Sequence, residues 1–283
     1  MDKKIRVAVN GFGRIGRAFV KIAWEQPEIE IVAVNDLGSL ENLAYLLKYD
    51  TVYKSWNHKV EIDGTDLIID DKKIKFISER DTTKLPWKDL EIDVVVESTG
   101  LFTSYDKAKF HLDDGAKKVV ISAPAKGDDE TTPGATILMS VNEDKFGTCD
   151  ITSNGSCTTN AASPIIGIMD EALGIEKAIL NTVHGYTASQ SLVDGPSKKD
   201  MREGRAAAQN IVPSSTGAAI AVTKAYPQFS GLFDGISIRV PVPAGSIVDI
   251  TFISKRDTTA EEVNEILKKA AEGSRWSKVF AVT

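Results

Sequence analysis

Short apolar runs alternate with helical patterns over the first half of the chain. Runs rich in β-branched residues at residues 5–9, 29–34, 92–97 and 119–122 have the length of buried strands. A helical pattern follows the first run as far as Trp24. Because strands that alternate with helices are typical of a mostly parallel sheet, we expect an α/β domain in this half.

The pattern changes beyond Cys157. Residues 187–217 are polar and lack a hydrophobic period, and a loop of this length in a compact domain usually serves a function. A capping signal at Thr259 precedes the last helical pattern. The predicted elements are helices at residues 158–173, 217–225 and 259–271, and strands near residues 175–183, 235–241 and 246–255.

The composition is that of a soluble enzyme. The 283 residues are 42% hydrophobic, enough for a sizeable core, and the net charge of −6 disfavours nucleic acid or an anionic membrane as a partner. No apolar run reaches transmembrane length, and the polar N-terminus lacks the pattern of a signal peptide. With two cysteines and no clustered metal ligands, we expect a cytoplasmic protein that needs no metal.

A glycine-rich turn follows the first predicted strand, and an acidic residue ends the next one. In dinucleotide-binding folds, glycines at this spacing allow a tight turn and close approach of the pyrophosphate to a helix N-terminus. The acidic residue binds the ribose of the adenosine. The alternative is a glycine-rich turn that binds nothing. We predict a dinucleotide site at Gly11, Gly13, Arg14, Ile15, Gly16 and Asp36.

Small polar residues follow two further predicted strands. Thr99 and Gly100 come after the run at residues 92–97, and Ser122 ends the run at residues 119–122. Ligands of open α/β sheets collect beyond the carboxyl ends of the strands, so we assign these residues to the cofactor site together with Arg80. An ordinary loop is an equal alternative for the small residues.

Cys157 lies in a polar turn just before the predicted helix at residues 158–173. A cysteine at a helix N-terminus meets the positive end of the helix dipole, which favours the thiolate. His184 is one of only three histidines, and an imidazole near the sulfur would stabilise the thiolate and move a proton. The pair predicts a covalent cysteine enzyme. A small buried cysteine and a core histidine are the alternatives, and we expect Cys149 to be structural.

The sequence resembles the phosphorylating glyceraldehyde-3-phosphate dehydrogenases over nearly its whole length. The resemblance implies NAD as the cofactor, a Rossmann domain at residues 1–156 and a catalytic α+β domain with a mixed or antiparallel sheet at residues 157–283. It also implies a homotetramer. The motifs that carry it lie at residues 9–17, 34–36, 97–100, 121–124, 156–160, 184–187, 213–219 and 239–241.

The resemblance implies a role for each matching side chain. Cys157 would attack the aldehyde of glyceraldehyde 3-phosphate, and His184 would accept the hydroxyl proton of the thiohemiacetal and steady its oxyanion. Inorganic phosphate would then attack the thioester that oxidation leaves. Thr187 and Arg239 match the site for the phosphate of the substrate; an arginine in an apolar run also needs an anion nearby. The attacking phosphate would bind at Ser156, Thr158, Thr216 and Gly217.

Two departures from the family pattern affect these expectations. Glu203 stands where the family usually has an arginine for the attacking phosphate, so we expect weaker phosphate binding unless Arg202 or Arg205 compensates. The sequence ends at Thr283, whereas family members continue for some tens of residues. For a chain ending there, the resemblance implies exposed apolar surface, low stability and little activity.

Two other functions remain open from the sequence. A relative that oxidises another phosphorylated aldehyde, such as erythrose 4-phosphate, would have the same motifs, because motifs do not set the size of a pocket. A weakly active fragment could persist as a nucleotide-binding module. The matched phosphate residues favour the three-carbon substrate of glycolysis and gluconeogenesis.

Overall fold

The computed structural model describes residues 3–126, 131–197 and 200–283. The chain forms two compact units, each described here by itself. The N-terminal unit comprises Met1–Ala135 and Lys145–Asn154, and the C-terminal unit comprises Thr136–Asp144 and Gly155–Thr283. None of the helices in the described ranges is both long and apolar enough to span a membrane.

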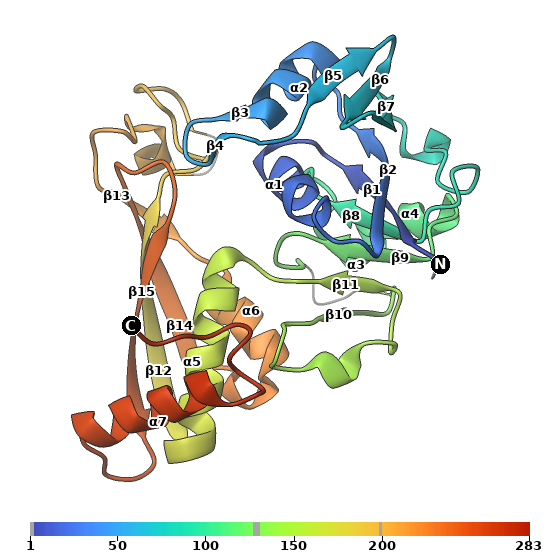
Figure 1. Ribbon diagram of the computed structural model, residues 1–283. Helices are drawn as coiled ribbons and strands as arrows, with labels where there is room; N and C mark the ends of the chain where they lie inside the picture. Colours follow the sequence, from blue (N-terminus) through green and yellow to red (C-terminus); the bar gives the residue numbers. More distant parts are fainter. Residues whose placement is uncertain (1–2, 127–130, 198–199) are drawn as a thin grey trace. The chain divides into compact units, whose positions relative to one another are not determined.

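A nine-stranded sheet organises the N-terminal unit, in the order β10-β11-β9-β8-β1-β2-β7-β6-β5 (Figure 1). The strands from β11 to β7 in this order are parallel, and β6 and β5 continue the sheet antiparallel. The order reverses between β1 and β8, which creates a switch point at their carboxyl ends. The strands are β1 Ile5–Asn10, β2 Ile29–Asn35, β5 Val60–Asp63, β6 Asp66–Ile69, β7 Lys72–Ile77, β8 Val94–Glu97, β9 Lys118–Ile121, β10 Gly134–Thr136 and β11 Ile151–Ser153.

Both faces of this sheet are buried, as its continuous apolar strands require. Val7 and Val9 of β1 belong to one cluster with Leu47 of the second helix, whereas Ala8 points to the other face and packs in a cluster with Trp87. This packing confirms the predicted α/β fold. The helices are α1 Arg14–Ala23, α2 Leu40–Lys48, α3 Tyr105–Ala108 and α4 Phe110–Asp113, with a 3₁₀ helix at Thr82–Lys84 and a small ribbon of β3 Tyr49–Asp50 with β4 Lys54–Ser55. A further 3₁₀ helix, Glu143–Lys145, spans the sequence boundary between the two units.

A four-stranded mixed sheet organises the C-terminal unit, in the order β13-β14-β12-β15. β12 is parallel to β14 and antiparallel to β15, and β13 is antiparallel to β14. The predicted mixed sheet is therefore confirmed. The elements are α5 Cys157–Leu173, β12 Ile175–Gly185, β13 Val212–Ser215, α6 Ala218–Ala225, β14 Phe233–Val240, β15 Ser246–Ser254 and α7 Ala260–Glu272, with 3₁₀ helices at Met201–Gly204 and Pro227–Phe229.

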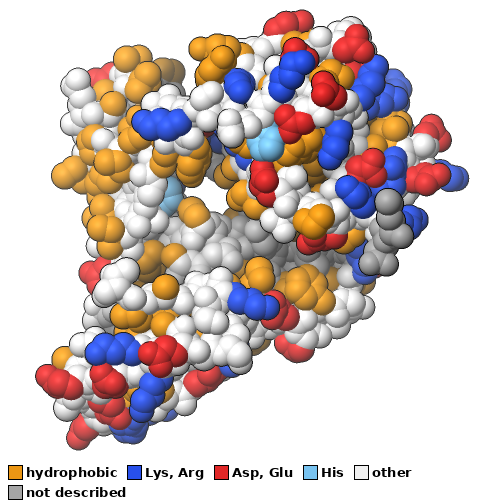
Figure 2. All heavy atoms as spheres, in the orientation of Figure 1, with side chains coloured by type: hydrophobic (Ala, Val, Ile, Leu, Met, Phe, Trp, Pro, Cys, Tyr) orange, Lys and Arg blue, Asp and Glu red, His pale blue; other side chains and the backbone are white. Residues whose placement is uncertain are grey.

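The helices of the C-terminal unit cover one face of its sheet. Leu180 of β12 packs in one cluster with Ile166 of α5 and Val222 of α6. Thr259 caps α7 by accepting a hydrogen bond from the backbone N–H of Glu262, as its sequence predicted. The face of α7 turned to solvent mixes acidic and basic side chains (Figure 2, lower left), which is typical of an amphipathic surface helix.

Several short strands were missed in the sequence analysis. β3 and β4 have two residues each, and β5, β10, β11 and β13 have three or four. β13 lies inside the polar stretch at residues 187–217. β13 is an edge strand that includes Pro213, a residue that edge strands tolerate because one side of their backbone needs no partner. Strands this short contain too few apolar residues to show a period, so only pairing with a neighbouring strand defines them.

Candidate active site

Cys157 is the first residue of α5, and its side chain is exposed. The preceding Ser156 caps the helix: its Oγ accepts a hydrogen bond of 3.1 Å from the backbone N–H of Thr159. Gly155 enters the cap with a φ of 69°, a left-handed conformation that glycine adopts without strain. The local sequence thus places the Cys157 sulfur at the N-terminus of a helix of 17 residues.

His184 brings its imidazole to this sulfur. The residue lies near the carboxyl end of β12, and its Nε2 is 3.3 Å from Cys157 Sγ. A contact of this length allows a proton to pass between sulfur and imidazole. The two candidate catalytic residues therefore meet within the C-terminal unit.

Arg239 approaches the opposite side of the same imidazole. His184 and Arg239 are register partners on the parallel strands β12 and β14, and Arg239 Nη1 is 2.7 Å from His184 Nδ1. Partial burial lowers the pKa of Arg239, and the charges of Cys157 and Glu203 oppose that shift. Among the described residues, the buried Nε of Arg239 has no hydrogen-bond partner.

A polar pocket of about 600 Å³ lies beside Arg239. Its lining includes Gln190, Ser214 and Arg239. Thr187 does not line the pocket, but its backbone N–H donates to Gln190 Oε1 at 3.0 Å and its Oγ1 is 2.9 Å from Ser189 Oγ. Gln190, Ser189 and Ser214 were not singled out from the sequence, because polar residues in a polar loop give no local signal.

The residues predicted for the attacking phosphate are used mainly in helix caps. Ser156 caps α5, and Thr216 Oγ1 accepts a hydrogen bond from the backbone N–H of Ala218 at the start of α6. Thr158 is buried, and Gly217 is exposed at the N-cap of α6. None of these four residues lines the pocket around Arg239.

Glu203 lines this pocket, and both neighbouring arginines pair with other carboxylates. Its Oε1 accepts a hydrogen bond of 2.6 Å from Ser214 Oγ. Arg202 instead binds Asp200 and holds the pKa of that carboxyl at about 2, while Arg205 pairs with Asp194 at 3.2 Å. The carboxylate of Glu203 therefore adds negative charge to a wall that also holds Arg239.

A second pocket, of about 470 Å³, lies at the carboxyl ends of the parallel strands of the N-terminal unit. Gly11 has a φ of 95°, and a Cβ there would lie 2.6 Å from the backbone N of Thr99, so only glycine fits. At Gly13 a Cβ would meet no atom within 4 Å, which leaves space for a ligand beside the N-terminus of α1. The predicted residues that line the pocket are Gly11, Gly13, Asp36, Arg80 and Thr99.

Asp36 is held in place by the glycine-rich turn. Its Oδ2 accepts a hydrogen bond of 2.6 Å from the backbone N–H of Phe12, and its Oδ1 accepts one of 2.8 Å from Gly38. Each carboxylate oxygen keeps a further lone pair for a ribose hydroxyl. A turn that only glycine fits, open space at a helix N-terminus and an oriented carboxylate together suit a dinucleotide.

The other predicted cofactor residues do not line this pocket. A Cβ on Gly16 would lie 2.1 Å from Gly11 O, so Gly16 serves the close packing of α1 on β1. Ser122 Oγ donates to Glu97 O at 3.0 Å. Gly100 has a φ of 75°, Ile15 is exposed, and Arg14 begins α1.

A buried polar network beneath the pocket was missed in the sequence analysis. Glu97 accepts hydrogen bonds from Asn10 Nδ2 at 2.6 Å and from the backbone N–H of Thr99 at 2.9 Å, and its Oε2 is 3.0 Å from His111 Nε2. Asn35 Nδ2 donates to Asn10 Oδ1 at 2.8 Å. Asn10, Asn35 and Glu97 are each the last residue of a strand. A polar residue at the end of a buried apolar run is therefore the sequence feature that could have revealed this network.

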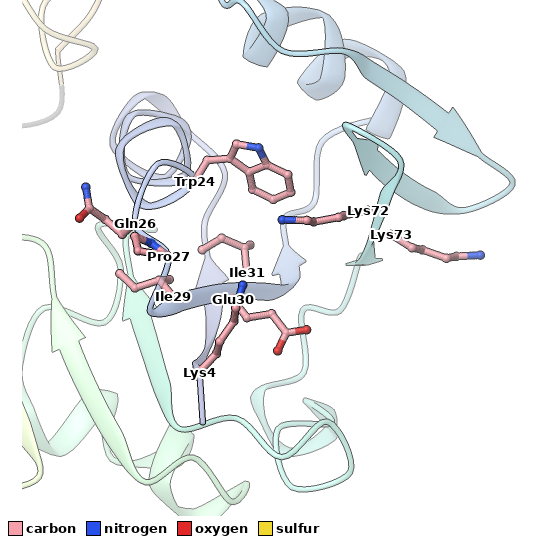
Figure 3. Close-up of a pocket in the computed structure, with 9 residues that line it drawn as sticks. All are labelled: Lys4, Trp24, Gln26, Pro27, Ile29, Glu30, Ile31, Lys72 and Lys73. Carbon is pink, nitrogen blue, oxygen red and sulfur yellow. The ribbon is translucent and has the colours of Figure 1, made fainter. Parts of the chain in front are cut away.

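A third pocket opens at the amino ends of β1, β2 and β7 (Figure 3). Lys4, Glu30 and Lys72 line it, and the Lys72 ammonium is 5.0 Å from the ring centroid of Trp24. Because it lies at the edge of the sheet opposite the glycine-rich turn, this pocket is separate from the dinucleotide pocket.

Comparisons with known proteins agree with this arrangement. Family models match residues 5–105 as "Glyceraldehyde 3-phosphate dehydrogenase, NAD binding domain" and residues 156–283 as "Glyceraldehyde 3-phosphate dehydrogenase, C-terminal domain". The chain is 47% identical to a glyceraldehyde-3-phosphate dehydrogenase of Colletotrichum lindemuthianum, over 95% of this chain and 78% of the relative. It is 48% identical to glyceraldehyde-3-phosphate dehydrogenase 2 of Streptomyces avermitilis, over 95% of this chain and 79% of the relative. A relative from Chlamydia muridarum with the same enzyme name is 48% identical over 95% of this chain and 80% of the relative.

Proposed function

The chain belongs to the glyceraldehyde-3-phosphate dehydrogenase family, and we propose that Cys157 and His184 are its catalytic residues. It is an NAD-dependent oxidoreductase that converts glyceraldehyde 3-phosphate and inorganic phosphate into 1,3-bisphosphoglycerate. The observation that carries the residue assignment is the distance of 3.3 Å between Cys157 Sγ and His184 Nε2. None of the described residues of the site favours erythrose 4-phosphate over the three-carbon substrate.

The side chains divide the chemistry between them. Cys157 Sγ attacks the carbonyl carbon, and the carbonyl electron pair moves to oxygen, where a proton yields the thiohemiacetal. His184 Nε2 takes the hydroxyl proton as that carbon is oxidised. The backbone N–H of Cys157, at the N-terminus of α5, stabilises the oxyanion. Inorganic phosphate then attacks the thioester, and the Cys157 thiolate is the leaving group.

The dinucleotide pocket of the N-terminal unit holds the cofactor. When bound, NAD supplies hydride acceptance, the chemistry that turns a thiohemiacetal into a thioester. Gly11 and Gly13 would allow the pyrophosphate of NAD to approach the N-terminus of α1, and Asp36 would bind the adenosine ribose. Arg80 and Thr99 line the same pocket. Five further residues do not line it and are assigned to the NAD site only from the family resemblance: Arg14, Ile15, Gly16, Gly100 and Ser122.

Two phosphate groups need sites in the C-terminal unit. Arg239, beside the imidazole, and Thr187 suit the phosphate of the substrate, because a guanidinium and a hydroxyl are strong donors to phosphate oxygens. The assignment of the attacking phosphate to Ser156, Thr158, Thr216 and Gly217 depends on the resemblance and on two helix N-termini, at α5 and α6.

Each of the two units has its own part in the proposed reaction. Residues 1–156 would bind NAD and residues 157–283 would carry out catalysis, since the dinucleotide pocket and the Cys157–His184 pair lie in different units. A homotetramer is supported by the outer face of the C-terminal sheet, where Ile179, Ile236 and Ile247 are 54%, 54% and 70% exposed. We place the enzyme in the cytoplasm, where its glycolytic substrates occur.

The direct assay is the rise in absorbance of reduced nicotinamide. It should require both glyceraldehyde 3-phosphate and inorganic phosphate. The same rate with erythrose 4-phosphate, or no dependence on phosphate, would contradict the assigned reaction.

The enzyme should prefer NAD over NADP by at least about tenfold in kcat/KM. The carboxylate of Asp36 is fixed by two backbone hydrogen bonds and would lie against a 2′-phosphate, and like charges this close repel by about 1–4 kcal/mol. Family members that prefer NAD have proline at the position of Pro196. The double variant Asp36→Gly, Pro196→Ser should shift the preference toward NADP. Equal kcat/KM for the two cofactors in the unaltered enzyme would refute the role of Asp36.

Replacing Glu203 by glutamine should lower the KM for inorganic phosphate by about tenfold. Removing one negative charge near a phosphate is worth on the order of 1–4 kcal/mol at a few ångströms, and glutamine can still accept the Ser214 hydrogen bond. Glu203→Arg should lower the KM further. Glu265→Gln, on the exposed face of α7, is the control and should leave it unchanged. An unchanged KM in both Glu203 variants would show that this carboxylate does not meet the attacking phosphate.

A further inference from the structure

His58 of the N-terminal unit presents each nitrogen of its ring to a different carboxylate. The residue lies in the loop between β4 and β5, where its Nε2 is 2.7 Å from Glu25 Oε1 and its Nδ1 contacts Asp70 Oδ2. An ionised carboxylate can only accept hydrogen bonds, so both contacts are hydrogen bonds only when each ring nitrogen carries a proton. The geometry therefore selects the positively charged imidazolium.

The two carboxylates come from segments that are distant in sequence. Glu25 lies in the turn that follows α1, whereas Asp70 lies in the turn between β6 and β7 and has a φ of 47°, a left-handed conformation that aspartate tolerates in tight turns. The Asp70 carboxylate also accepts hydrogen bonds from Trp24 Nε1 at 3.1 Å and from the backbone N–H of Lys59 at 2.9 Å. His58 thus joins the end of α1 to the antiparallel edge of the sheet.

The ring lies over the edge of a hydrophobic core. Its centroid is 4.5 Å from that of Trp56, which meets Trp24 edge to face at 6.4 Å. Both indoles pack against the cluster that contains Val20 of α1. Lys48 Nζ donates to the carbonyl oxygen of His58 at 2.8 Å, which holds the loop backbone on α2. A change in the charge of the ring therefore acts directly on this packed edge.

The charged groups around the ring favour its protonated form. Partial burial opposes the charge of His58, but the hydrogen bonds and charges of Asp70 and Glu25 outweigh burial, so the pKa of His58 is raised above its usual 6.5. The hydrogen bond from His58 likewise lowers the pKa of Asp70 below its usual 3.8. The other charged groups on the packed elements are Lys21 of α1 and Lys72 of β7 beside the indoles (Figure 3 for Lys72), Lys48 of α2, Asp71 of the β6–β7 turn, and Lys59, which pairs with Glu61.

We propose that His58 is a pH-sensitive clamp, in which the protonated ring fastens the turn after α1 to the turn between β6 and β7. When the ring loses one of its two N–H protons, a lone pair faces a carboxylate and that contact becomes repulsive. The direction of the effect follows from linkage. A group whose pKa is raised by folding stabilises fully below its unfolded-state pKa, here about 6.5, and this contribution is lost as the pH rises through the pKa of the folded state. In acid the clamp is lost when Asp70 is protonated, below pH 3.8.

The first test compares melting of the unaltered chain and His58→Gln at pH 6 and at pH 9. Glutamine can donate to one carboxylate but carries no charge, so the variant should melt about 2–4 °C lower at pH 6, and this difference should largely disappear at pH 9. Tryptophan fluorescence follows the transition, because Trp24 and Trp56 lie at the clamp. A ring that serves only for packing would cost the same at both pH values, so an equal difference would overturn the clamp.

The second test measures the ring itself and does not require a variant to keep its stability. The chain has three histidines, so a ¹⁵N-histidine NMR titration resolves them, and the signal missing in His58→Gln identifies this one. We expect both ring nitrogens of His58 to be protonated at pH 6, with a pKa above 6.5.

A matched pair of carboxylate variants tests the cause of the shift. Glu25→Gln should lower the pKa of His58, because it removes one of the two carboxylates. Glu28→Gln, at an exposed position three residues further on, is the control and should leave that pKa unchanged. A pKa of His58 at or below 6.5 in the unaltered chain, or one that Glu25→Gln does not lower, would overturn the clamp. These results do not depend on the catalytic roles proposed above.

Discussion

Cys157→Ser is expected to lower the dehydrogenase rate by about 10⁴-fold or more, because a serine hydroxyl is far less available as an anion near neutral pH than a thiol. The cap of α5 depends on Ser156 and not on the sulfur, so the fold should be retained. NAD binding should change little, since the dinucleotide pocket lies wholly in the N-terminal unit. The measurement is steady-state formation of NADH, together with NAD binding by equilibrium dialysis.

The only other cysteine provides a matched control. Cys149 is half-buried, and its Sγ donates to Ile151 O at 3.3 Å, a contact that a serine hydroxyl can reproduce. Cys149→Ser should therefore retain full activity. Comparable turnover of Cys157→Ser and the unaltered enzyme would remove Cys157 as the nucleophile.

His184→Asn is expected to reduce kcat by about 10²–10⁴-fold, the usual range for losing a positioned acid–base group. Asparagine is close in size but cannot exchange a proton with Cys157 or with the hydroxyl of the thiohemiacetal. The loss should appear in pre-steady-state formation of NADH as well as in turnover, because the proton is needed before phosphate attacks.

Another histidine serves as the control for this variant. His58 lies in the N-terminal unit, where its Nε2 is 2.7 Å from Glu25 Oε1. His58→Asn should leave kcat unchanged even if it lowers the melting temperature. A His184→Asn enzyme that retains more than about a tenth of the rate would show that a different group moves the proton.

Much of the fold could be predicted because its signals are local. The runs at residues 5–9 and 29–34 are apolar without interruption, as expected for strands buried on both faces, and they became β1 and β2. The cap at Thr259 follows from neighbouring residues alone. In contrast, β13 has one apolar residue at its start and is defined by hydrogen bonds to β14, a strand distant in sequence.

In the candidate sites, too, some residues have a local sequence signal and others are defined only by contacts with distant residues. Residue type and position indicated Cys157, His184 and the glycine-rich turn, because each needs a particular residue in a particular local conformation. The polar residues that support them gave no such signal. Glu97 and His111 meet only because β8 and α4 pack together, and Trp87 Nε1 completes that contact by donating to His111 Nδ1 at 2.9 Å.

The sequence by itself determined where glycine must stand, which segments are buried and which helix begins with a cysteine, because these depend on backbone conformation and on the period of neighbouring side chains. The tertiary structure alone decided that His184 lies 3.3 Å from the Cys157 sulfur, that Arg239 reaches the same imidazole, and that Glu203 meets Ser214 instead of an arginine. Such contacts depend on strand register and on helix packing, which bring together residues far apart in the chain and leave no trace in the periodicity of any one segment.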